Sequence, residues 1–210
     1  MRLTTTTNVS VDGVMQGLGG PDEDRSGGFD RGGWAIPLID AETGDYLNQA
    51  YGSADAFLFG RRTYEIFAGY WGAMPNPETN PIAAALNSRP KYVVSASLAD
   101  PRWAGTTVLQ GDLVTAIGDL KVNHDGELLV PGSGALVRWL LANDLVDRLD
   151  LVTYPVVVGQ GRRLFPHSGP DLALELVSSR TTSRGITIQT YRPRGRPEYA
   201  TSTVDPSDVF

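Results

Sequence analysis

The feature that most constrains the fold is a regular alternation of β-rich and helical segments. Eight extended runs, rich in β-branched and aromatic residues and mostly bounded by Gly, Pro or Asp, predict strands. They cover residues 2–11, 56–59, 91–95, 106–109, 127–130, 148–158, 172–178 and 186–191. Four segments with apolar residues near i, i+3 and i+4 predict helices. They cover residues 63–71, 81–86, 113–121 and 135–142. This order predicts an α/β fold with a mostly parallel central sheet and helices on both faces.

Three stretches depart from this alternation. The last two predicted strands are separated only by the polar run 180–185, which indicates a closing antiparallel hairpin. Residues 16–33, here called the glycine-rich loop, disfavour regular structure and predict a long loop after the first strand. Residues 193–210 lose apolar periodicity, so we expect one domain at 1–192 followed by a flexible tail.

Composition excludes several kinds of chemistry. The absence of cysteine removes thiolate nucleophiles, iron–sulfur clusters and Cys-based zinc sites, and two histidines are too few for a His-rich metal site. Neither Lys91 nor Lys121 follows a glycine, so a phosphate-binding P-loop is absent. A formal charge of -6 makes nucleic acid and anionic membranes unexpected partners. Without a long apolar run, we expect a cytoplasmic protein.

Two strand-to-helix turns carry the main chemical signal. At the first, a predicted strand breaks into Gly132, Ser133 and Gly134 and a helix opens at Ala135 and Leu136. Glycines allow a ligand to approach the backbone, and the free amides at a helix start favour an anion such as a pyrophosphate. The alternative interpretation of the same residues is a tight strand-to-helix turn that binds no ligand.

The second turn follows the strand that ends near Phe59. Gly60 precedes Arg61, Arg62 and Thr63, which offer guanidinium groups and a hydroxyl to a phosphate. Adjacent arginines are also common as a solvated surface pair. Ser95 brings a hydroxyl to the carboxyl edge of the predicted sheet, where open parallel sheets bind ligands.

These motifs, in this order, resemble the dihydrofolate reductase-like superfamily. The resemblance rests on the segments 9–14, 60–65, 93–95, 132–136 and 145–165, with the run Pro155 to Phe165 as its most specific part. More narrowly, residues 2–192 are similar to the reductase domain of the bifunctional riboflavin-biosynthesis deaminase-reductase and its stand-alone relatives. Such a resemblance implies a three-layer, dihydrofolate reductase-like fold.

The resemblance also implies a site for NADPH across the strand ends. By analogy, Arg61 and Ser95 face the 2'-phosphate, with Arg62 as the alternative, and Thr63 faces the pyrophosphate. The segment from Gly132 to Leu136 then lies along the phosphates and the nicotinamide side. A homodimer is expected by the same analogy, with the apolar strand near Val156 as a candidate contact.

Three further residues are candidates for the substrate side. Asp12, between the first strand and the glycine-rich loop, binds the substrate or helps to supply a proton, unless it only forms an Asp-Gly turn. Trp34 and Tyr154 are candidates for contacting the substrate, with core packing as the alternative.

The leading hypothesis is an NADPH-dependent reductase of a small heterocyclic or carbonyl substrate. The chain lacks the Cys-containing deaminase signature, so it resembles a free-standing reductase. A non-catalytic NADPH-binding sensor and a true dihydrofolate reductase remain alternatives. The latter needs a carboxylate facing the pterin, and Asp40, Glu42 and Asp45 lie in the relevant stretch.

Overall fold

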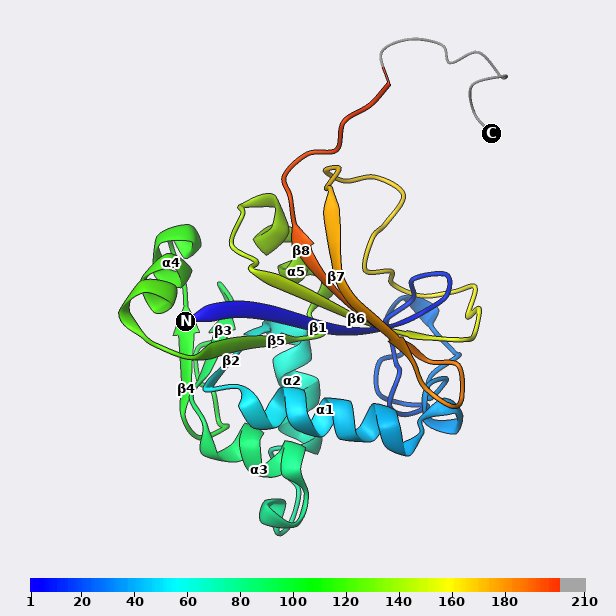
Figure 1. Cartoon of the computed structure of the whole chain (residues 1–210). Helices are drawn as coiled ribbons and strands as arrows, with labels where there is room; N and C mark the ends of the chain where they lie inside the picture. The colour runs from blue at the N-terminus through cyan, green and yellow to red at the C-terminus, as the bar shows by residue number, and fades with distance from the viewer. Residues whose placement is uncertain (201–210) are drawn as a thin grey trace, which may run out of the picture.

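The computed structural model describes residues 1–200 and contains one eight-stranded sheet (Figure 1). The spatial order is β4-β3-β2-β5-β1-β6-β8-β7. Neighbours from β4 to β6 run parallel, and β8 is antiparallel to both β6 and β7. The strands are β1 (Arg2–Ser10), β2 (Ala56–Gly60), β3 (Lys91–Val94), β4 (Thr106–Leu109), β5 (Glu127–Pro131), β6 (Arg148–Tyr154), β7 (Leu174–Thr181) and β8 (Thr187–Pro193).

Helices cover both faces of this sheet. The α-helices are α1 (Ala41–Ser53), α2 (Arg61–Tyr70), α3 (Pro81–Ser88), α4 (Leu113–Asn123) and α5 (Gly134–Ala142). Single 3-10 turns occur at η1 (Ser26–Gly28), η2 (Ile36–Leu38) and η3 (Pro77–Thr79). The first three α-helices pack on the sheet face that carries Phe57 and Phe59, whereas α4 and α5 pack on the face of Leu3 and Leu58. The predicted α/β fold class is therefore confirmed.

The parallel strands bring their carboxyl ends to one edge of the sheet. β1 pairs with both β5 and β6, and β5 also pairs with β2, so these four strands form the sheet centre. Helices cover both faces, so β2 and β5 bury apolar runs, whereas β1 buries four consecutive threonines, Thr4 to Thr7. The turns that leave β2 and β5 consequently start from adjacent positions.

Two elements differ from the sequence prediction. The predicted strand 148–158 stops at Tyr154, since Pro155 has no amide to continue the ladder and the chain turns toward β1, where Val11 N donates to Val156 O (2.9 Å). Helix α1 was absent from the predicted set, because Gly44 and Gly52 weaken its pattern. Its start nevertheless carries a recognisable cap, as Asp40 accepts a hydrogen bond from the Thr43 amide (2.8 Å).

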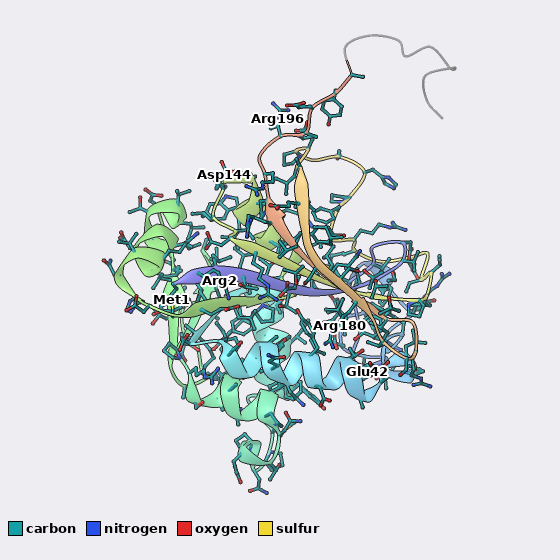
Figure 2. The ribbon with its side chains drawn as sticks, viewed as in Figure 1. Met1, Arg2, Glu42, Asp144, Arg180 and Arg196 are labelled. Atoms are coloured by element: carbon teal, nitrogen blue, oxygen red, sulfur yellow. The ribbon has the colours of Figure 1, made fainter. Side chains whose placement is uncertain are left out.

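The predicted hairpin is present as β7 and β8, and its tip meets the start of α1. The Ser183 amide donates to Glu42 (2.7 Å) and the Arg184 amide donates to Asp40 (3.3 Å), which places Glu42 near the hairpin tip in Figure 2. In the tail, Arg194 N donates to Ala173 O (2.8 Å). The remainder of the predicted tail, 201–210, lies outside the described residues. Among residues 1–200, no helix has the length and apolar character needed to cross a membrane.

Candidate functional site

The turns after β2 and β5 lie against each other. The Ser133 hydroxyl accepts a hydrogen bond from the Gly60 amide (3.0 Å), so the side chain of one turn holds the backbone of the other. Ser133 adopts a left-handed conformation, with φ of 55° and ψ of 48°. Such a conformation is unfavourable for a residue with a Cβ, and the bond to Gly60 offsets part of that cost.

The helices that begin at these turns have no side-chain caps. Gly60 precedes α2 and Ser133 precedes α5, and neither supplies a capping hydrogen bond. The first amides of a helix lack partners within the helix and carry the positive end of its dipole. Two such starts, side by side, form a suitable place for an anion.

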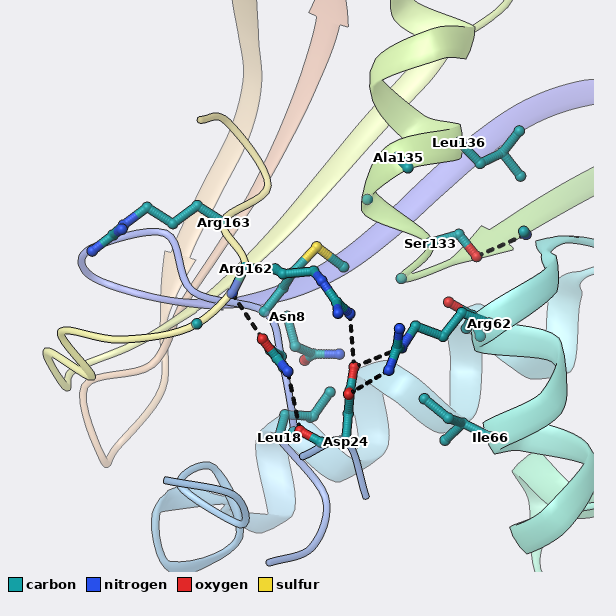
Figure 3. Close-up of a pocket in the computed structure, with 18 of the residues that line it drawn as sticks. Asn8, Leu18, Asp24, Arg62, Ile66, Ser133, Ala135, Leu136, Arg162 and Arg163 are labelled. Carbon is teal, nitrogen blue, oxygen red and sulfur yellow. Dashed lines mark hydrogen bonds and ion pairs between the residues drawn. The ribbon is translucent and has the colours of Figure 1, made fainter. Parts of the chain in front are cut away.

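Both helix starts open into one pocket with a cavity volume of about 740 Å³ (Figure 3). Nine of the residues predicted to bind the cofactor line it, which are Gly60, Arg61, Arg62, Thr63, Gly132, Ser133, Gly134, Ala135 and Leu136. Four predicted site residues do not line this pocket, which are Asp12, Trp34, Ser95 and Tyr154.

Gly134, the first residue of α5, leaves room for the side chain of Met15. A Cβ there would collide with the sulfur of Met15, which also lines the pocket. The Met15 side chain therefore lies directly over the start of α5, at the boundary between the two turns and the glycine-rich loop.

Ser95 follows β3 and does not line the pocket. Its hydroxyl accepts hydrogen bonds from the amides of Ser97 (3.2 Å) and Leu98 (3.0 Å), which shapes the turn after the strand. Arg61 reaches this turn by donating to the Ser97 hydroxyl and pairs with Glu65 (2.7 Å). The structure thus brings Ser95 close to Arg61 through Ser97.

Asp12 connects two loops instead of facing the pocket. Its carboxylate accepts hydrogen bonds from the Ser10 hydroxyl (2.6 Å) and from the amides of Val158 (2.9 Å) and Gly159 (2.9 Å), and it pairs with Arg163 (3.1 Å). Although burial alone would raise the pKa of Asp12, these hydrogen bonds hold it well below its usual range. An ionised, fully bonded carboxylate suits the positioning of loop 155–173 and does not suit the donation of a proton.

Trp34 and Tyr154 lie behind the pocket wall. Their rings pack edge to face with centroids 5.6 Å apart, and Tyr154 is fully buried. The Tyr154 hydroxyl donates to Oδ1 of Asn8 (3.2 Å), and the Trp34 indole donates to the Gln16 carbonyl (2.8 Å). Asn8 and Gln16 do line the pocket, so Tyr154 and Trp34 support the pocket by holding these two residues.

Several pocket residues had no role in the sequence analysis. Gln16 links the two sides, since its side chain donates to Ser26 O (2.9 Å) and accepts from the Arg162 amide (3.0 Å). Asp24 pairs with Arg62 (2.8 Å) and Arg162 (3.0 Å), as the dashed lines in Figure 3 show. Arg162 lies within the most specific segment of the resemblance, which is the signal that could have identified it.

Comparisons with known proteins identify the family and the fold of the chain. Residues 2–188 match the family described as RibD C-terminal domain. A curated relative, the uncharacterized protein YyaP of Bacillus subtilis (strain 168), is 25% identical over 195 residues, covering 92% of this chain and 96% of its own.

Solved structures with this fold include three with related descriptions. A putative riboflavin biosynthesis protein from Shewanella sp. PV-4 superposes with a TM-score of 0.69 at 22% identity, covering 92% of this chain and 99% of that one. A pyrimidine reductase-like protein from Corynebacterium diphtheriae gives 0.63 at 16% identity, covering 92% of each. Acinetobacter baumannii RibD gives 0.62 at 11% identity, covering 92% of this chain and 58% of that one. The family match spans residues 2–188, so this chain belongs to the RibD C-terminal domain family and has its dihydrofolate reductase-like fold.

Proposed function

We propose that this protein is an NADPH-dependent reductase that transfers a hydride to a small heterocyclic or carbonyl substrate. The observation that carries the proposal is the pair of adjacent, uncapped helix starts of α2 and α5 at one pocket. Free helix-start amides next to arginines suit the phosphates of a dinucleotide.

The residues present fit NADPH. Thr63 and the amides at the starts of α2 and α5 would receive the pyrophosphate, and Arg61 would receive the 2'-phosphate, with Ser95 shaping the adjacent turn. When bound, NADPH supplies the hydride. The protein then contributes orientation and exclusion of water, and favourable alignment lowers a barrier by several kcal/mol, up to about 7–11.

The remaining part of the pocket suits a flat, mainly apolar substrate. Leu18, Tyr51, Ile66 and Phe67 line it together with Asn8. Because Oδ1 of Asn8 accepts from Tyr154, its amide nitrogen is left to donate to an acceptor such as a ring carbonyl. This combination favours a small heterocycle that carries a hydrogen-bond acceptor.

The structure offers less support for a true dihydrofolate reductase. Asp40, Glu42 and Asp45 do not line the pocket, and the first two are bonded to the tip of the β7–β8 hairpin. Asp12 holds loop 155–173 in place, and we assign it a positioning role instead of proton transfer.

The test is a titration with NADPH followed by a search for turnover. Tryptophan and nicotinamide fluorescence report binding, and loss of nicotinamide absorbance in the presence of pterins, aminopyrimidines and quinones reports reduction. Binding with oxidation supports a reductase. Binding without oxidation across this panel favours an NADPH sensor, and no binding removes both functions.

The expected homodimer stays a prediction. Val11 and Val157 are apolar and largely exposed on neighbouring loops, which are joined by the bond from Val11 N to Val156 O. Sedimentation equilibrium at micromolar concentration measures the state, and a monomeric mass would reject the dimer.

A further inference from the structure

The side chain of Asp24 lies between two arginines from different parts of the fold. Its carboxylate receives two hydrogen bonds from Arg62 of α2, at 2.9 and 2.8 Å, and one from Arg162 of loop 155–173, at 3.0 Å. The Ser26 amide (3.0 Å) and hydroxyl (2.5 Å) also donate to it. Asp24 thus attaches the glycine-rich loop to both walls of the pocket (Figure 3).

Burial is unequal among the three charged groups. The Asp24 side chain is 7% exposed, whereas the Arg62 and Arg162 side chains are 52% and 48% exposed. Although burial would raise the pKa of Asp24, the hydrogen bonds from Ser26 and the pair with Arg62 lower it, so the group is ionised at neutral pH. One negative charge therefore faces two positive charges, so the three side chains together carry a net charge of +1.

The two guanidinium groups also border the proposed phosphate site. Arg62 precedes Thr63 in the first turn of α2, and both arginines line the same pocket as the uncapped helix starts. Guanidinium groups bind phosphate and carboxylate oxygens in the same bidentate geometry. A pyrophosphate carries more charge than a carboxylate, so it competes effectively for the same donors.

We propose that Arg62 and Arg162 form a phosphate-binding pair for which the Asp24 carboxylate is an internal competitor. Arrival of the pyrophosphate of a dinucleotide, as the proposed function requires, transfers the two arginines from Asp24 to the ligand. The glycine-rich loop then loses its attachment to α2. Asp24 therefore sets the affinity of the pocket for phosphates and couples their binding to movement of the loop.

Inorganic pyrophosphate tests the exchange without any turnover. Titration calorimetry at fixed ionic strength compares the wild-type protein with Asp24→Asn and with Asp22→Asn. Asp22 is the matched control, because it lies in the same loop and its pair with Arg25 (3.0 Å) is exposed. Both substitutions remove one negative charge, but only Asp24→Asn releases Arg62 and Arg162.

We expect Asp24→Asn to bind pyrophosphate about tenfold more tightly than wild type, a typical size for coupling between competing states. Asp22→Asn should change the affinity less than about twofold, because exposed pairs are weak. Adding Arg62→Gln or Arg162→Gln to Asp24→Asn should remove the gain. Equal affinities for the two Asn variants, weaker binding by Asp24→Asn, or no binding by any variant would overturn the proposal.

Limited trypsin digestion provides the second readout. Arg25 and Arg31 are the cleavage sites within the glycine-rich loop. Pyrophosphate should accelerate cleavage after Arg25 in the wild-type protein and should have little effect on Asp24→Asn, in which the attachment is already weakened. Unchanged cleavage of the wild type at saturating pyrophosphate would contradict the exchange.

These experiments distinguish a failure of the proposed exchange of arginines between Asp24 and the ligand from a failure of the proposed reductase function. Turnover of NADPH with identical behaviour of Asp24→Asn and Asp22→Asn would keep the reductase and reject the internal competitor. Tighter pyrophosphate binding by Asp24→Asn without NADPH binding would keep the exchange and reject the reductase.

Discussion

The helices at the pocket and the helices away from it begin in different ways. Helices α1, α3 and α4 each start with a side chain that accepts hydrogen bonds from the first amides, namely Asp40, Asn80 and Asp112. Helices α2 and α5, which border the pocket, start at Gly60 and Ser133 without such a bond. The chain therefore satisfies helix starts with its own side chains wherever no ligand is expected.

Ser133 shows that the difference is more than the absence of a suitable residue. Serine is a favoured N-cap residue, yet the Ser133 hydroxyl accepts from the Gly60 amide of the neighbouring turn. The side chain that could cap α5 instead fixes the spacing of the two helix starts. The amides of α5 are left for another acceptor.

The largest expected effect comes from supplying the missing cap. Ser133→Asp places a carboxylate where the proposed pyrophosphate binds, and aspartate tolerates the left-handed backbone. Repulsion between charges about 5 Å apart near a protein surface costs about 3 kcal/mol, which corresponds to a roughly 100-fold weaker NADPH affinity. Fluorescence titration measures the affinity, and thermal unfolding confirms that the variant is folded.

Ser133→Asn is the matched control for this charge. Its side chain has the same shape and the same tolerance of a positive φ but remains neutral, so we expect a loss of less than about tenfold. Equal losses for the two variants would mean that geometry, and not an anion at the helix starts, controls binding.

Arg61→Ala tests the cofactor identity at the same helix start. Only NADPH carries the 2'-phosphate, and a charge-assisted hydrogen bond contributes about 1.5–3 kcal/mol, so NADPH should weaken by about ten- to 100-fold relative to NADH. Arg25→Ala removes another exposed arginine that pairs with a carboxylate and serves as the control. A loss of the same size for both cofactors would indicate that Arg61 only stabilises α2 through Glu65.

The sequence predicts the architecture well because most of it depends on local patterns. The strand–helix alternation and the closing hairpin are confirmed, and helix starts at Pro81 and Leu113 agree with the structure. Helix α1 was missed because Gly44 and Gly52 weaken its helical pattern. In the folded protein, packing against the sheet stabilises this helix. The end of β6 depends on Pro155, a local signal, although the predicted strand 148–158 continues beyond it.

The candidate site likewise contains some residues that local patterns predict and others that they do not. Residues within the two strand–helix turns could be placed at the pocket from sequence, since parallel strands deliver their ends to one edge. Asn8, Gln16, Asp24 and Arg162 reach the pocket only through contacts between segments more than 100 residues apart or through the path of the glycine-rich loop. Such contacts leave no periodic pattern in the sequence.

Removing the cap of a helix that does not border the pocket should have a smaller effect. It should lower stability and leave NADPH affinity unchanged. In α3, Asn80 accepts from the amides of Ile82 (3.0 Å) and Ala83 (3.1 Å), so Asn80→Ala should lower the free energy of unfolding by about 1 kcal/mol. NADPH affinity should not change. Urea unfolding and the fluorescence titration measure the two quantities, and a clear loss of affinity would contradict the separation between the two groups of helices.

An effect of similar size concerns the other end of α3, where a buried lysine donates hydrogen bonds to backbone carbonyls. Lys91 is fully buried and donates to the carbonyls of Leu86 (2.7 Å) and Arg89 (2.7 Å), and burial lowers its pKa to about 8. Between this value and the ordinary value of 10.5, the unfolded chain binds more protons than the folded chain, so stability contributed by Lys91 rises with pH. Relative to Lys91→Met, the wild-type protein should therefore gain about 1 kcal/mol of unfolding free energy from pH 9 to pH 10. Urea unfolding of both proteins across this range measures the two free energies of unfolding. If the wild-type value does not rise relative to that of Lys91→Met as the pH increases, the lysine stays charged in the fold because its bonds to the helix end outweigh burial.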